Sequence, residues 1–338
     1  MSEPASIDAA VATAAERSRP AAGAARSLLL PSIADWVFAA VLVWLFFGAR
    51  GAQSLLADGD AGWHIRTGEA ILATGRLPAT DPFSFTMAGQ VWFAWEWLAD
   101  VVLALAHQAG GLQAVVLLAG AVIAATAALT LRYMLWFGVN VFLAVFGTML
   151  VCGVSTMHWL ARPHMFTWGF LLATLWLLES DRRRPSRRVW WLVPMTAVWV
   201  NTHGGFVAAI ICAAVFAVGG GLEELWAARE REERFRWFVP APARRYGLLT
   251  AACAAATLAN PWGWQLHVHV AAYLQSDFIL KYVEEFQSPN FRGEAMRLLE
   301  GTMLVSAVVC GRTLWRGEFV WPLLTLAWAH ASLTSVRH

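Results

Sequence analysis

Two aspartates lie one residue apart, at Asp58 and Asp60, in the longest polar segment of the chain. Carboxylates at this spacing can share a divalent cation such as Mg²⁺ or Mn²⁺, or one of them can act as a general base. They follow an apolar stretch, which would hold them close to a membrane surface. A structural interpretation is also open, because Asp60 could cap a helix that begins near Trp63.

A third carboxylate, Glu96, stands between Trp95 and Trp97. In so apolar a setting its pKa would be raised, which suits acid–base chemistry. The alternative is that Glu96 is a first-turn residue, favoured there by the dipole of the helix that follows. We keep Glu96 with Asp58 and Asp60 as a candidate catalytic residue.

Basic and amide side chains in other turns form a second candidate set, suited to binding a phosphate or a polar substrate. Arg162 and His164 flank a proline at the start of an apolar run, where an arginine could grip a lipid phosphate or simply extend toward lipid headgroups. His203 precedes two glycines and is either a ligand contact or satisfied by nearby backbone. The full substrate-binding set is His64, Arg66, Arg162, His164, Asn201, His203, Arg337 and His338.

The composition determines the class of protein that must position these residues. Of the 338 residues, 58% are hydrophobic and 14% are charged, whereas a soluble domain carries about a quarter charged residues. Several apolar runs approach or reach the roughly 20 residues that a helix needs to cross a bilayer. The pattern predicts an all-α polytopic membrane protein and disfavours a β-barrel. The sequence has no basic patch with interleaved aromatic residues, which is the pattern that would indicate nucleic-acid binding.

Periodicity divides the chain into a tail and a membrane domain. Residues 1–29 are expected to be a disordered cytoplasmic tail, and residues 30–338 to form the transmembrane domain. An outer loop of about residues 50–110 should end in an amphipathic interfacial helix, Glu96–Ala109, closed by Gly110 and Gly111. The nine expected spans are about 33–48, 112–132, 138–158, 163–179, 189–203, 205–222, 246–260, 297–311 and 319–335.

The sidedness of the domain follows from its arginines. With nine spans, the arginine loop 182–188 and the charged loop 223–245 both lie on the cytoplasmic side, together with the N-terminus. Counting Glu96–Ala109 as a further span would invert everything after it and place the arginine loop outside. The positive-inside rule therefore favours an interfacial helix and a multi-pass protein of a bacterial inner membrane, with the histidine-bearing turns outside.

Several segments resemble a broad group of bacterial multi-pass proteins, which in turn looks like the GT-C class of glycosyltransferases. The segments that carry the resemblance are 59–69, 81–86, 96–98, 162–164, 201–206, 260–261, 288–289 and 335–338. The resemblance implies a lipid-bilayer setting, a polyprenyl-phosphate sugar as donor and an outward-facing site. It also implies that Asp60, with Asp58, matches the first-loop acid that activates the acceptor or holds a metal. Members of the class usually have more spans, and similar proteins continue past the position of His338. Three alternatives therefore stay open: the chain is truncated, it is a natural short form, or it is inactive alone.

We therefore expect a membrane glycosyltransferase that acts on an acceptor hydroxyl on the extracytoplasmic side. Two alternatives stay open. One is a noncatalytic protein that assembles with a protein partner, and the other is a transporter of lipids or solutes. A proton-coupled transporter needs ionisable residues near the middle of its spans, whereas the polar residues of this chain gather at the expected span ends, with His330 as an exception.

Overall fold

A computed structural model describes residues 31–48, 51–231 and 239–336, and this part of the chain is helical. The described segments contain no strand, only an isolated bridge between Thr80 and Val91 that closes a loop. The main helices are α3 (Ile33–Phe47), α4 (Asp60–Thr74), α5 (Trp97–Trp136), α6 (Val141–Ser155), α7 (His164–Arg183), α8 (Leu192–Trp199), α9 (Val207–Glu230), α10 (Ala241–Ala256), α11 (Trp264–Leu274), α12 (Asp277–Tyr282), α13 (Glu294–Trp315) and α14 (Val320–Thr334). The prediction of an all-α protein is confirmed.

Four helical stretches of the described chain are long and apolar enough to cross a membrane: Trp97–Trp136, Val141–His158, Gly204–Glu230 and Met296–Trp315. The shorter helix Ile33–Phe47 is also apolar. Large apolar side chains of α3, α6 and α13 point outward, as expected where helices face lipid. These features are those of a membrane protein. Each of the nine ranges expected to span overlaps a helix, whereas the crossing of a bilayer by all nine stays a prediction.

Helix α5 consists of two helices joined at a kink. Gly110 (φ −167°) and Gly111 (φ 64°) leave the helical conformation, and Gly111 adopts a positive φ that few other residues tolerate. The expected break at these glycines is confirmed. The first half of α5 contacts α4 at Asp100 and Ala104, and the second half contacts α3, α6 and α7 at Gly120, Met134 and Tyr133. The first half is therefore a separate short helix, as the sequence predicts, although nothing here places it at a membrane interface.

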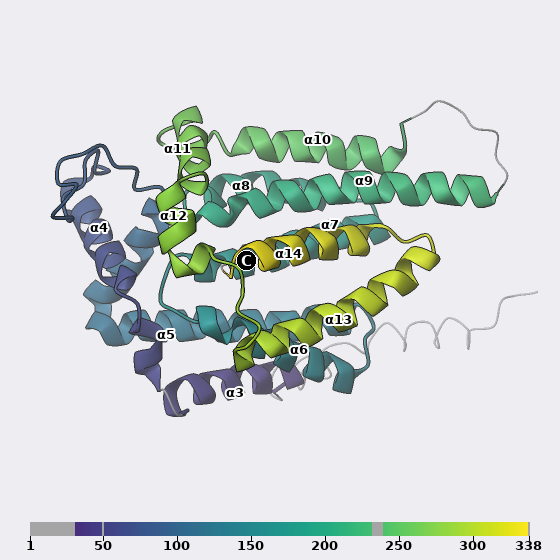
Figure 1. Cartoon of the computed structure of the whole chain (residues 1–338), viewed down its shortest axis with the longest axis horizontal. Coiled ribbons are helices and arrows are strands. Elements are labelled where there is room, and N and C mark those ends of the chain that lie inside the picture. Colours follow the sequence, from purple (N-terminus) through teal and green to yellow (C-terminus); the bar gives the residue numbers. More distant parts are fainter. Residues whose placement is uncertain (1–30, 49–50, 232–238, 337–338) are drawn as a thin grey trace, which may run out of the picture.

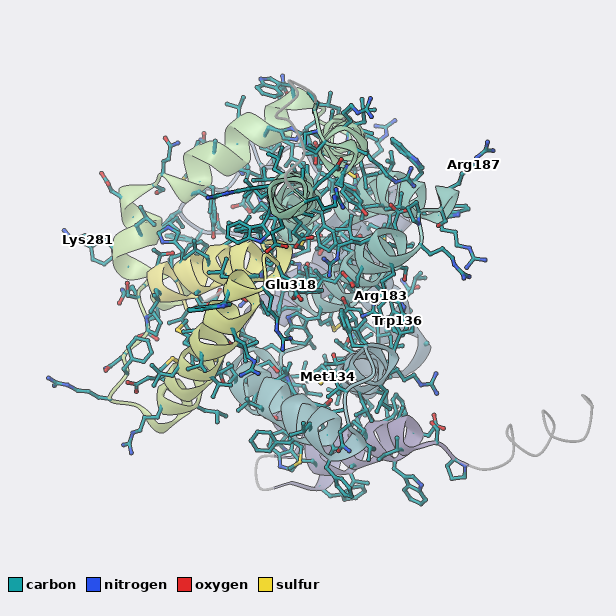
Figure 2. The ribbon with its side chains drawn as sticks, turned by 90° about the vertical axis from the view of Figure 1, so that its right-hand side faces the viewer. Met134, Trp136, Arg183, Arg187, Lys281 and Glu318 are labelled. Atoms are coloured by element: carbon teal, nitrogen blue, oxygen red, sulfur yellow. The ribbon has the colours of Figure 1, made fainter. Side chains whose placement is uncertain are left out.

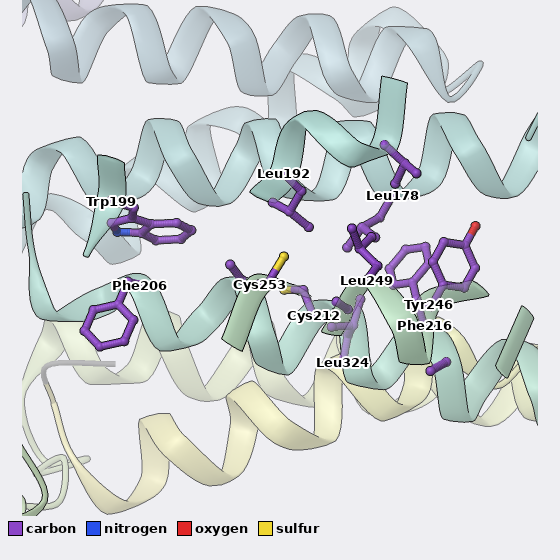
Figure 3. Packing of buried hydrophobic residues seen from close by; sticks show 14 of the residues in the cluster. Leu178, Leu192, Trp199, Phe206, Cys212, Phe216, Tyr246, Leu249, Cys253 and Leu324 are labelled. Carbon is purple, nitrogen blue, oxygen red and sulfur yellow. The ribbon is translucent and has the colours of Figure 1, made fainter. Parts of the chain in front are cut away.

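A run of three glycines on α9 sets the packing of the second half of the fold. A Cβ atom at Gly219 would lie 2.8 Å from Val320 Cα of α14, and one at Gly220 would lie 2.9 Å from Pro242 Cβ of α10. Small residues of this kind let helices approach closely where side-chain contacts hold them together. The core beside this run is built from α7, α8, α9, α10 and α14 around Trp199 and Phe216 (Figure 3).

Helix α7 joins two polar regions at opposite ends of the bundle. It begins at His164 and has Arg182 and Arg183 in its last turn, and its 20 residues extend about 30 Å, close to the hydrocarbon thickness of a bilayer. We call the region around His64, His164 and His203 the histidine end, and the region around Arg182 and Arg183 the arginine end. The segment 51–97 with α4, and the helices α11 and α12, gather at the histidine end, on the left of Figure 1.

The arginine end is held by a network of ion pairs. Arg182 bonds Glu223 (3.0 Å), whose other oxygen accepts the amides of Phe319 and Val320 at the start of α14. The guanidinium of Arg183 lies 4.2 Å from the ring centre of Trp136, and Figure 2 looks onto this pair. Residues 223–230 of the expected charged loop 223–245 form the last part of α9. Residues 232–238 of the predicted loop 223–245, and residues 1–30 with the predicted tail, lie outside the described residues.

Candidate functional site

At the histidine end, Arg162 is bound by three carboxylates from three parts of the chain. Its Nη1 lies 2.6 Å from Asp58 Oδ2 and 2.7 Å from Glu285 Oε1, and its Nη2 lies 2.6 Å from Asp60 Oδ2. The arginine side chain is 13% exposed, whereas that of Asp60 is 41% exposed. Burial lowers the pKa of Arg162, but attraction to the three carboxylates outweighs it, so the pKa is raised and the charge is retained.

The local backbone explains how the two aspartates reach one guanidinium. Asp60 is the first residue of α4, and its amide donates to Asp58 Oδ1 at 2.7 Å. The expectation that Asp60 caps a helix beginning near Trp63 is therefore wrong, because the helix already begins at Asp60 and Asp58 binds its first amide. Asp60 is left to face Arg162 from a first-turn position that suits an anion.

The carboxylates do not fit the predicted Mg²⁺ or Mn²⁺ as they stand. No group of three or more histidine, cysteine, aspartate or glutamate side chains suited to a metal occurs in the described part of the chain. Arg162 already lies where a cation shared by Asp58 and Asp60 would bind, and two cations would repel each other at that distance. The reaction proposed below therefore uses no metal ion.

We call Arg162 and its three carboxylates the ion cluster. Behind it, four further side chains form a buried group. His64 Nδ1 lies 2.6 Å from Asp100 Oδ1, and its Nε2 faces Glu96 Oε2 at 3.7 Å. The other oxygen of Glu96 lies 3.5 Å from His203 Nε2. All four residues are buried, and Asp100 is fully enclosed. Glu96 is the N-cap residue of α5, so it lies at the helix N-terminus as the structural interpretation expects. Its side chain makes no capping hydrogen bond and faces the two imidazoles, and a catalytic role stays a prediction.

The backbone around His203 fixes which of its nitrogens carries the proton. The amide of Gly205 points at Nδ1 (3.0 Å), and so does the hydroxyl of Thr167 (2.8 Å), which itself accepts from Trp199 Nε1. A backbone N–H can only donate, so Nδ1 must accept and the proton of the neutral ring lies on Nε2. His203 thus directs an N–H toward Glu96. The backbone therefore satisfies one nitrogen of His203, as one interpretation expects, and a carboxylate faces the other, whereas contact with a ligand stays a prediction.

Two further predicted binding residues are engaged by backbone groups. His164 Nε2 donates to the carbonyl of His158 (2.6 Å), and His158 Nε2 donates to the carbonyl of Val336 (2.9 Å). Asn201 donates to the carbonyls of Ala197 and Ala259, each at 2.8 Å, and accepts from Trp97 Nε1. These side chains join the expected outer turns to one another, so they position the site.

The ion cluster and the buried group adjoin each other. The pKa of His64 is held well below its ordinary value, first by burial and then by the charges of Arg162 and His164. The rings of His164 and His203 lie 6.3 Å apart. Asp60 and His64 are also four residues apart on α4, which places them on one face of that helix. Residues chosen from separate segments of the sequence therefore belong to a single polar region.

Of the remaining candidates, one lies away from this region and two lie outside the described residues. The side chain of Arg66 is 71% exposed and pairs with Glu69 (2.6 Å), so the structure does not bring it to the site. Arg337 and His338 lie outside the described residues. The chain that precedes them reaches the site, since Val336 accepts a hydrogen bond from His158.

Three residues of the site were missed by the sequence prediction. Asp100 lies on the expected amphipathic helix Glu96–Ala109, on a side that packs on α4 and is buried. Neither Glu285 nor Thr167, which lies in an apolar run, is marked by a distinguishing sequence pattern. The sequence could have indicated Asp100, because it lies four residues after Glu96 and therefore on the same helix face as Glu96.

Comparison of the chain with family models, with curated proteins and with solved structures gives no match. The function is therefore argued from the residues of the site.

Proposed function

We propose that the protein is a membrane glycosyltransferase that moves a sugar from a polyprenyl-phosphate donor to an acceptor hydroxyl. The observation that carries the proposal is the convergence of Asp58, Asp60 and Glu285 on Arg162, beside a buried histidine group. In such a region the exposed carboxylate of Asp60 can accept a proton, and the guanidinium of Arg162 can bind a phosphate. Both would lie at the end of apolar helices, where a lipid-linked substrate presents its headgroup.

In the proposed orientation the arginine end faces the cytoplasm and the histidine end faces outward, across a bacterial inner membrane. The arginine loop 182–188 supports this orientation through the positive-inside rule. All nine expected ranges would then cross the bilayer, and the first half of α5 would lie at the outer interface. The N-terminus would be cytoplasmic.

The proposed reaction uses Asp60 as the base. Its carboxylate takes the proton of the acceptor hydroxyl while the hydroxyl oxygen attacks the anomeric carbon. The bond from that carbon to the phosphate oxygen breaks, and the electron pair leaves with the polyprenyl phosphate. Asp60 is chosen over Asp58 and Glu285 because its side chain is the most exposed of the three.

Arg162 would serve the same reaction in two stages. Before transfer, its guanidinium holds Asp58 and Asp60 in place. Once Asp60 is protonated and neutral, its pairing with Nη2 of Arg162 weakens, and this nitrogen can turn to the negative charge that develops on the leaving phosphate. A charge placed where the transition state develops the opposite charge is an effective form of catalysis.

The test is substitution of Asp60 in the full-length protein, reconstituted with a panel of polyprenyl-phosphate hexoses and pentoses. Release of polyprenyl phosphate reports turnover. Asp60→Asn keeps the size and the hydrogen bonding of the side chain but cannot take the proton, so we expect transfer to fall by about 10²- to 10⁴-fold.

Glu69→Gln is the matched control. Glu69 lies on the same helix as Asp60 but pairs with Arg66 and His107, away from Arg162, so transfer should be retained. Transfer by Asp60→Asn at the wild-type rate would remove Asp60 as the base. A wild-type protein that releases no polyprenyl phosphate from any donor would favour the alternative of a noncatalytic partner protein.

A further inference from the structure

The buried group behind the ion cluster contains two acidic residues with very different surroundings. Asp100 is fully enclosed, its Oδ1 lies 2.6 Å from His64 Nδ1, and its Oδ2 has no hydrogen-bond partner. Glu96 has one oxygen toward His64 Nε2 and the other toward His203 Nε2. A buried carboxylate needs donors for its charge, because an uncompensated charge in an apolar interior is costly. Glu96 has imidazole groups on both sides, whereas Asp100 has an orphan oxygen.

Hydrogen-bond logic connects the two acids through His64. If Asp100 carries a proton on Oδ1, it donates to His64 Nδ1, and the neutral imidazole then carries its own proton on Nε2. That N–H is directed toward Glu96, as is the Nε2–H that Gly205 imposes on His203. Every short contact then pairs a donor with an acceptor. The oxygen left alone on Asp100 is a neutral carbonyl, which costs less to bury unpaired than a charged one.

We propose that the four residues form a buried proton-binding site, in which Asp100 holds the proton and Glu96 is the ionised acid between His64 and His203. The site does not rest on glycosyl transfer, and it adds a role for residues that no substrate can reach in the buried state. It links α4, which carries Asp60, to α5 and to the turn before α9. The reduced pKa of His64 supports a neutral imidazole at its centre.

Two other proton arrangements explain the geometry less well. If Asp100 were ionised and His64 carried its single proton on Nδ1, Nε2 would face Glu96 as an acceptor, so Glu96 would have to be protonated. The charge would then lie on the acid with the orphan oxygen. If His64 were doubly protonated, a buried cation would lie near Arg162 and His164, whose charges disfavour it.

The site also makes the packing of α4 against its neighbours depend on pH. Glu96 is faced by His64 from α4 and His203 from the turn before α9, with Asp100 of α5 behind His64. Arg162 and His164 act on the group from the start of α7. Protonation of Glu96 on acidification would remove the acceptor that both imidazoles share and would loosen α4.

Infrared spectroscopy of the wild-type protein tests where the proton lies. Full-length protein made by cell-free synthesis in an ester-free detergent would carry ¹³C either in all aspartate carboxyl groups or in all glutamate carboxyl groups. We expect a protonated-carboxyl band at pH 7.5 that shifts with the aspartate label and stays with the glutamate label. A shift with the glutamate label alone would place the proton on glutamate, and absence of the band would mean that both acids are ionised. Either outcome would overturn the proposal.

A pair of amide substitutions assigns the band to the site. Asp100→Asn can still donate to His64 Nδ1, so it should abolish the band but leave the midpoint of thermal unfolding nearly unchanged. Glu96→Gln should keep the band, but it removes the charge that both imidazoles face, so it should lower that midpoint. A band that survives in Asp100→Asn would assign the proton elsewhere. The reverse order of stabilities would show that Asp100 is the ionised acid.

Discussion

Gly68 of α4 lies directly on the backbone of Asp100 in α5. A Cβ atom at position 68 would be 2.0 Å from the carbonyl oxygen of Asp100 and 2.7 Å from the methyl group of Ala104. The absence of a side chain at Gly68 is therefore what lets α4 approach α5 closely enough for His64 to bond Asp100. A glycine on one helix thus sets the position of the His64 side chain one turn away.

Replacement of Gly68 by alanine should separate α4 from α5. Because the nearest atom is backbone, the clash cannot be relieved by a change of rotamer, and we expect a loss of about 1–3 kcal/mol or more in the free energy of unfolding. Gly62→Ala is the matched control, since nothing lies within 4 Å of a Cβ at that position of the same helix. Thermal unfolding of both variants in one detergent is the measurement. Equal midpoints would show that the helices are not in close contact.

Removal of Arg162 should destabilise the histidine end. Arg162→Ala leaves Asp58, Asp60 and Glu285 to repel one another, at an expected cost of about 1–2 kcal/mol near pH 7 because the site is only partly buried. The measurement is the thermal midpoint of both proteins at pH 7.5. Equal midpoints would show that repulsion among the three carboxylates does not destabilise the variant.

His64 should make the protein less stable at mildly acidic pH. Its folded-state pKa lies well below the ordinary value of 6.5, so the unfolded chain binds more protons as the pH falls through about 6.5. Its contribution is therefore fully present above that pH and is lost as the pH falls toward the folded-state pKa. Burial also lowers the pKa of His269, which acts in the same direction.

The check is the fall in thermal midpoint from pH 7.5 to 5.0. His64→Gln should show a smaller fall than wild type, whereas His107→Gln, a substitution in a half-exposed pair with Glu69, should keep it. Glu69 and Asp81 have lowered pKa values, and their contributions are lost only below about pH 4.5. An unchanged fall in His64→Gln would mean that His64 is not held neutral.

Single cysteines test the proposed sidedness. Gly59 and Gly204 both leave open space for a side chain, so Gly59→Cys and Gly204→Cys should be tolerated and should react with a membrane-impermeant maleimide from the same, outer side of intact cells. Arg187→Cys, at the arginine end (Figure 2), should react only after the cells are opened. The wild-type protein, with its four native cysteines, gives the background. Labelling of Gly59→Cys and Gly204→Cys from opposite sides would divide the proposed site.

The helices were predictable because their signals are local. The apolar run 112–132, the break at Gly110 and Gly111, and the turn at Asp81, whose carboxylate accepts the amides of Phe83 and Ser84, all depend on neighbouring residues. Charge at the helix ends was predictable for the same reason. His164 and Arg182 lie at opposite ends of α7, as the sequence requires of a single continuous helix.

The pairing of side chains was not predictable, because it depends on which helices touch. The sequence by itself determined an all-α architecture with apolar helices of membrane length, and it placed the polar residues in the turns. Only the tertiary structure decided that Arg162 meets three carboxylates and that Asp100 is buried against His64. The physical reason is that the approach of α4 to α5 depends on steric contact between segments about 30 residues apart, and a helical period shows which residues share a face but not which helix covers it.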